Sequence, residues 1–103
     1  MTSASSPDSG FDAEGVAAAA AACPSVSRLT AGSLGVEVAT YLPGRRVRGV
    51  RLDGGTVEVH VAALDGVPLP RVGEEVRAAV APLVGTASVS VYIDDLDKAA
   101  VDQ

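Results

Sequence analysis

The most regular alternation of apolar and polar residues along the chain lies on either side of Gly54-Gly55. Alternate positions on both sides carry valine or leucine: Val50, Leu52, Val57, Val59 and Val61. A period of two is typical of β-strands, and two glycines between such runs provide the positive φ angles that a tight hairpin turn requires. The sequence therefore predicts a β-hairpin over residues 47–61, with these side chains on one buried face.

The two-residue loop also predicts the register of this hairpin. It sets four cross-strand pairs: Val50 with Val59, Arg51 with Glu58, Leu52 with Val57, and Asp53 with Thr56. The pair of Arg51 and Glu58 joins opposite charges on the face away from the core. A loop at Asp53-Gly54 is the alternative; it would keep the faces but place Val50 opposite Val57.

An alanine run predicts a first helix. Residues Ala17–Ala22 have high helix propensity, and Pro24 ends the run. Asp12 is the expected N-cap, with Phe11 and Val16 placed as a hydrophobic staple.

A second helix is predicted between Pro70 and Gly85. Its apolar residues recur at helical spacing: Val72, Val76, Val80 and Leu83. Arg71 and Glu75 are spaced for an i,i+4 ion pair. Pro82 should distort the last turn.

Three further strands complete the predicted fold: Ser25–Leu29, Val36–Leu42 and Ala87–Ile93. The connection through the second helix should make the last strand parallel to the second hairpin strand. We therefore expect an α/β (α+β) two-layer sandwich: a small mixed β-sheet with a central hairpin, and two helices packed on one face. Residues 1–10 are expected to be a disordered lead-in, 11–96 a single domain, and 97–103 an acidic tail.

Composition limits the classes of protein that fit this chain. Its 103 residues suffice for one modest core, which must consist of Val, Leu and Ala because aromatic residues make up only 3%. The net charge of −5 argues against general nucleic-acid binding, which needs positive charge to displace counterions. The single cysteine, Cys23, excludes an internal disulfide and a cysteine-rich zinc site. We expect no signal peptide, because no basic segment precedes an apolar run, and no membrane span, because no apolar run reaches ~18 residues.

Residues capable of catalysis or metal binding are few. His60 is the only histidine, and its position in the hairpin places it on the solvent side of the sheet, where it is expected to be an ordinary surface residue. Asp94, Asp95 and Asp97 lack the spacing of a calcium loop and are expected to be a solvated acidic terminus. Cys23 is expected to pack rather than react. No phosphate-binding glycine motif is present. We predict no catalytic residue, no cofactor and no metal site.

One local charge contrast is a candidate binding site. Half of the eight basic residues fall within seven positions and form the arginine cluster: Arg45, Arg46, Arg48 and Arg51. Charges on a strand edge prevent sheet-to-sheet aggregation, which is one interpretation. The other is recognition of an acidic partner, a lipid headgroup or a cell-wall polyanion, and the acidic end of a second copy is one such partner. Arg48 lies two residues before Val50, which in a continuous strand places it on the buried face. The sheet must therefore be uncovered there, or the guanidinium must reach past its edge.

Several short segments, in order, resemble the alkaline shock protein family of Gram-positive envelope stress response proteins, in its short actinobacterial form. The matching pieces are Cys23-Pro24-Ser25-Val26, residues 38–47, Gly49-Val50, residues 57–61, residues 75–77, and residues 89–91 with 94–96. Ser25 departs from the glycine that usually follows the proline in that family. The resemblance implies a non-enzymatic, abundant cytoplasmic protein that self-associates and lies beneath the membrane through a small membrane-anchored partner.

The sequence thus predicts a non-enzymatic protein that acts in the cell-envelope stress response through self-association and protein–protein contacts near the membrane. The arginine cluster is the expected partner-binding site. Two alternatives remain: a small-ligand-binding module, which would need a polar pocket, and a nucleic-acid-binding module using the arginine cluster.

Overall fold

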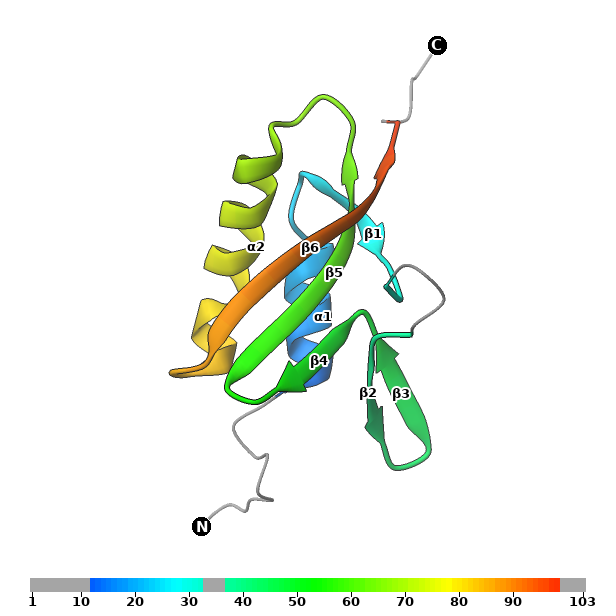
Figure 1. The fold of residues 1–103 in the computed structure, drawn as a ribbon, viewed down its shortest axis with the longest axis vertical. Coiled ribbons are helices and arrows are strands. Elements are labelled where there is room, and N and C mark those ends of the chain that lie inside the picture. The colour runs from blue at the N-terminus through cyan, green and yellow to red at the C-terminus, as the bar shows by residue number, and fades with distance from the viewer. Residues whose placement is uncertain (1–11, 33–36, 99–103) are drawn as a thin grey trace.

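The computed structural model describes residues 12–32 and 37–98, and within them two helices pack on one face of an open sheet (Figure 1). This confirms the predicted mixed two-layer fold. The helices are α1, Ala13–Ala21, and α2, Leu69–Val84.

Strand β5, Thr56–Leu64, is the centre of the four-stranded sheet. Two short strands share one of its edges: β4, Val50–Asp53, pairs with its first half, and β1, Val26–Leu29, pairs with its second half, both antiparallel. On the other edge β6, Ser88–Asp97, runs parallel to β5, as the helical crossover predicted. The sheet thus joins the start, middle and end of the described chain.

The predicted hairpin register is confirmed, since Val50 pairs with Val59 and Leu52 with Val57. The turn differs in one detail. Only Gly54 has a positive φ, of 61°, whereas both glycines were expected to have one.

The hairpin begins three residues later than predicted because Gly49 interrupts the chain. It has a φ of 88°, its N–H donates to the Val38 carbonyl, and its own carbonyl accepts from the His60 N–H. The residues before it form β3, Arg45–Arg48, which pairs with β2, Ala39–Leu42, in a separate two-stranded sheet. Arg48 therefore has no place on the buried face of the main sheet, and the face predicted for it was wrong.

The predicted features of the helices hold with small shifts. The Asp12 side chain caps α1 by accepting from the Gly15 N–H, and Gly85 ends α2 with a φ of 62°. Pro82 lies inside α2, near its end. Phe11, the other half of the expected staple, lies outside the described residues.

The core is built almost entirely from valine and alanine, as composition required. Val76 and its neighbours along α2 pack against the central valines of β5, all of them fully buried. Two expectations fail at the margins of this core. Leu52 is 41% exposed although it was placed on the buried face, and Val84 rather than Leu83 is the buried residue at the end of α2.

Strand β6 continues four residues past its predicted end at Ile93. Asp94, Asp95 and Asp97 therefore belong to the sheet rather than to a solvated tail. Within residues 12–32 and 37–98, no helix is long and apolar enough to cross a membrane.

Candidate functional site

The hairpin of β2 and β3 stands away from the main sheet as an arm (Figure 1). We call it the arginine arm, because β3 carries Arg45, Arg46 and Arg48. The hydrogen bonds of Gly49 with Val38 and His60 join the arm to the main sheet. Tyr41 on β2 is 69% exposed. The arm thus presents both an aromatic ring and positive charge to solvent.

Acidic residues of the same chain accompany each arginine of the arm. Arg45 lies 2.9 Å from Glu14 of α1, and Arg46 and Arg48 both lie within about 3.5 Å of Glu37. The Arg45 and Arg48 side chains remain more than half exposed. Exposed ion pairs of this kind contribute about 0–1 kcal/mol, so an external acid can replace the internal one at little cost.

Arg51 does not belong to the arm, so the structure brings together three of the four arginines of the cluster. It lies on β4 and pairs with Glu58 at 2.8 Å across the hairpin, as its register predicted. Glu58 is buried, and the Arg51–Glu58 pair covers part of the sheet face opposite the helices.

The same face carries His60, which is only 8% exposed. The sequence placed it on the correct face but wrongly expected a surface residue. Its Nδ1 lies 2.8 Å from an Asp94 oxygen, and its ring stacks on Tyr92 with centroids 4.4 Å apart. Its Nε2 lies 3.6 Å from Glu58 and makes no hydrogen bond within the described chain. The histidine is thus held between two carboxylates beneath an aromatic ring.

The acidic residues of β6 bind β1 and the residue after it, although the Asp95 side chain stays 59% exposed. Asp94 accepts a hydrogen bond of 2.8 Å from the Thr30 hydroxyl, and Arg28 pairs with Asp95 and Asp97. The hydrogen bond from Arg28 lowers the pKa of the Asp97 carboxyl. Nothing in the sequence singles out Arg28, because it lies nearly 70 positions from Asp95 and Asp97 and only the fold brings β1 and β6 to the two edges of β5.

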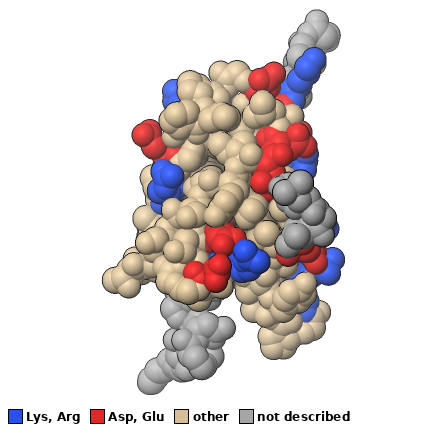
Figure 2. Space-filling view, in the orientation of Figure 1, with Lys and Arg blue, Asp and Glu red and all other residues tan. Residues whose placement is uncertain are grey.

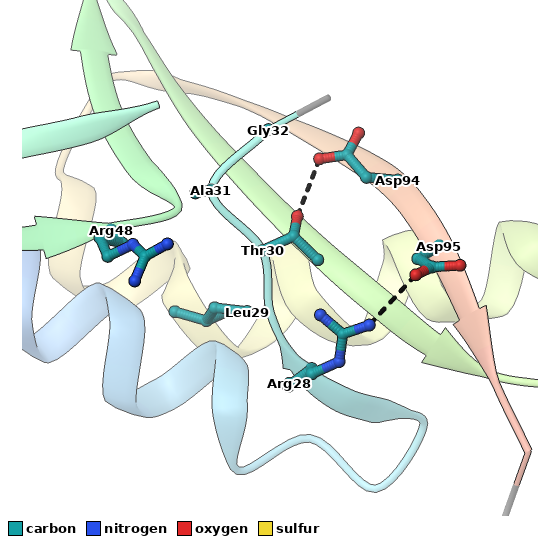
Figure 3. A pocket seen from close by; sticks show the side chains of 8 residues that line it. All are labelled: Arg28, Leu29, Thr30, Ala31, Gly32, Arg48, Asp94 and Asp95. Carbon is teal, nitrogen blue, oxygen red and sulfur yellow. Dashed lines mark hydrogen bonds and ion pairs between the residues drawn. The ribbon is translucent and has the colours of Figure 1, made fainter. Parts of the chain in front are cut away.

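A cavity of about 450 Å³ lies beside these contacts (Figure 3). Arg28 approaches it from β1, Arg48 from β3, and Asp94 and Asp95 from β6. Acidic and basic side chains both line this cavity, and most of them already form ion pairs or hydrogen bonds within the chain. Figure 2 shows the same mixture on this face, where acidic and basic atoms lie close together without a broad positive patch. The cavity therefore favours neither an anion nor a cation.

On the helix side, Glu75 links α2 to the start of β1. It accepts a 2.7 Å hydrogen bond from the Ser25 hydroxyl and pairs with Arg71 at 3.5 Å, the predicted i,i+4 contact. These contacts, the Ser25 hydrogen bond above all, lower the pKa of the Glu75 carboxyl. Ser25, where the resembled family usually has glycine, thus has a defined structural role.

Cys23 is buried beside Glu75. Burial, together with the nearby Glu75 charge, raises the pKa of the Cys23 thiol, which donates to backbone carbonyls. A buried thiol with a raised pKa is a poor nucleophile. Among the described residues, no three His, Cys, Asp or Glu side chains are grouped as a metal site would require.

Comparison of the chain with protein-family models, curated proteins and solved structures found no match.

Proposed function

We propose that this chain is a non-enzymatic protein that acts through self-association and protein–protein contacts, with the arginine arm as its partner-binding element. Resemblance to the alkaline shock protein family supports a role in the cell-envelope stress response. On this proposal the protein is cytoplasmic and reaches the membrane through a small anchored partner.

The projecting arm is the observation that carries the proposal. The arm is anchored to the body, since Val47 packs against the core and the Thr40 hydroxyl donates to the Val50 carbonyl, so its exposed side is held in a fixed position. The arm exposes Tyr41 beside arginine side chains, and tyrosine and arginine are the residue types enriched at the energetic centres of protein interfaces. Its partner should present carboxylates that replace Glu14 and Glu37 at the guanidinium groups.

The alternatives receive less support. A small-ligand site would need an enclosed, mainly apolar pocket with a few polar groups, whereas the cavity beside Arg28 and Arg48 is lined by paired charges. A nucleic-acid module would need unpaired basic groups on a positive surface, whereas the net charge is −5.

Charge reversal on the arm tests the proposal. The double variant Arg45→Glu and Arg46→Glu should reduce association in sedimentation velocity and reduce recovery of specific partners in co-purification with mass spectrometry. Raising the salt concentration should weaken wild-type association, because exposed charges are screened within ~10 Å at about 0.1 M salt.

A matched control changes the net charge equally elsewhere. Arg77→Glu with Lys98→Glu reverses two basic residues outside the arm, one on α2 and one just after β6, neither of which forms an ion pair within residues 12–32 and 37–98. If the arm variant and the control associate equally, and salt has no effect, the arginines serve only to protect the strand edge.

A further inference from the structure

The outer edge of β6 is open. Within residues 12–32 and 37–98, β6 hydrogen-bonds only to β5, although it is the longest strand of the sheet. The Ser88 N–H donates to the Gly55 carbonyl, so the backbone groups of Ser88 point toward β5. Because these directions alternate along a strand, the N–H and C=O groups of Val89, Val91 and Ile93 point outward.

The apolar side chains at this edge are incompletely covered. On β5, Val57, Val59 and Val61 are at most 1% exposed. Their neighbours on β6, which are Val89, Val91 and Ile93, are only partly buried although they face the same helical layer. A further strand beside β6 would complete their burial.

Charge is distributed unevenly along this edge. Residues 88–93 contain no charged residue, no proline and no glycine, whereas acidic residues occupy positions 94, 95 and 97. Native edge strands usually carry a charge, a proline or a bulge that prevents pairing with another chain. Here those devices, including the bulge between Ile93 and Asp95, protect only the second half.

We propose that the first half of β6 pairs with β6 of a second copy, antiparallel about a twofold axis at Val91. This goes beyond the arm but rests on the proposed self-association: the β6 joint makes a dimer, and the salt-sensitive contacts of the arm link that dimer to further copies or to other partners. Val91 then exchanges hydrogen bonds with its own counterpart, and Val89 does so with Ile93 of the second copy. The two four-stranded sheets become one continuous sheet.

The helical layer and the acidic half of β6 together favour one direction of pairing. In the antiparallel arrangement Asp95 and Asp97 of the two copies lie at opposite ends of the joint. A parallel twofold pairing has its axis along the strands and would turn the helices of the second copy to the other face of the sheet, so Val89, Val91 and Ile93 of the two copies would no longer share one covered face. The second copy is therefore favoured in one orientation, and the closed twofold contact limits this assembly to a dimer.

A proline at the joint tests the proposal. Val91→Pro removes an outward N–H but no hydrogen bond to β5, and proline is tolerated on strand edges at such positions. Sedimentation over a concentration series should show a wild-type dimer whose dissociation constant rises about tenfold or more in Val91→Pro. Val91→Ala keeps the N–H and should remain dimeric. Far-UV circular dichroism checks that each variant is folded.

Cross-linking tests the register in variants that keep the backbone hydrogen bonds. In a Cys23→Ala background, Ser90→Cys and Tyr92→Cys are made in separate chains. Antiparallel pairing at Val91 places position 90 opposite position 92 of the other copy, so a disulfide should form efficiently only when the two variants are mixed. Self-linking of each variant alone would show that the strands do not pair antiparallel about Val91 and would overturn the proposal, as would a monomer at all concentrations.

These experiments distinguish the β6 joint from association through the arginine arm. Edge pairing through uncharged residues should be insensitive to salt and to Arg45→Glu with Arg46→Glu. If Val91→Pro and Val91→Ala dimerise equally while the arm variant abolishes association, the arm remains supported and the β6 joint is wrong.

Discussion

Replacement of Gly49 by alanine should be among the most damaging single changes in this protein. Gly49 has a φ of 88°, where a residue with a Cβ is strained by about 1–3 kcal/mol. The added Cβ would lie 2.6 Å from the Thr30 carbonyl oxygen, which is backbone and cannot rotate away. The main chain must therefore move, which weakens the hydrogen bonds of Gly49 with Val38 and His60, each worth about 0.5–1.5 kcal/mol.

These contributions sum to a loss of about 2–6 kcal/mol, a large part of the stability of a small domain. Urea unfolding followed by far-UV circular dichroism measures it. Two glycines of the adjoining hairpin serve as controls. Gly54 has a positive φ of 61° but open space around it, so Gly54→Ala should show strain alone, about 1 kcal/mol. Gly55→Ala has neither problem and should stay within about 0.5 kcal/mol. If Gly49→Ala costs no more than Gly54→Ala, the close approach to Thr30 has no energetic importance.

Three further changes have defined outcomes. Val76→Ala removes a fully buried side chain from the middle of α2 and should cost roughly 1–3 kcal/mol in the same urea assay; a loss under about 0.5 kcal/mol would show that the site relaxes to fill the space. The lowered pKa of Glu75 means that its stabilising contribution is present above the ordinary value of 4.5 and is lost as the pH falls through the folded-state pKa. Ser25→Ala should therefore reduce the acid-dependent part of the unfolding free energy, and identical pH profiles of variant and wild type would contradict this. Cys23 should react with a thiol reagent only as fast as the protein opens, so fast labelling of the folded protein would show that the thiol is accessible.

The parts of the fold that depend on nearby residues were predictable from the sequence. The register of β4 and β5 follows from the loop length and from alternation on both sides of it, and it was confirmed in full. The cap at Asp12 and the stripe through Val76 also follow from local rules, since each depends on residues within a few turns.

What failed depended on contacts between distant segments. The division of the predicted strand at Gly49 reflects the approach of Thr30, which no local pattern shows. Leu52 alternates correctly, yet it is exposed because burial also requires a neighbouring element to cover that end of the sheet. The burial of His60 depends on Asp94, thirty-four positions away. The sequence identified the four arginines of the candidate site. It did not predict that three of them lie on the arm while Arg51 pairs with Glu58 on the main sheet.

The bulge in β6 explains why the acidic residues were misjudged and why the strand has two different halves. Ile93 pairs with Val61, but the next residue of β5, Ala62, pairs with Asp95, so Asp94 is the extra residue. In a regular strand Asp94 and Asp95 would point to opposite faces. The bulge instead lets both bind groups on the face away from the helices, Asp94 through His60 and Asp95 through Arg28. The same irregularity separates an acidic half that holds β1 from an uncharged half whose edge is open. The two roles therefore belong to different parts of β6. The joint proposed at Val91 uses residues 89–93, which lie before the bulge.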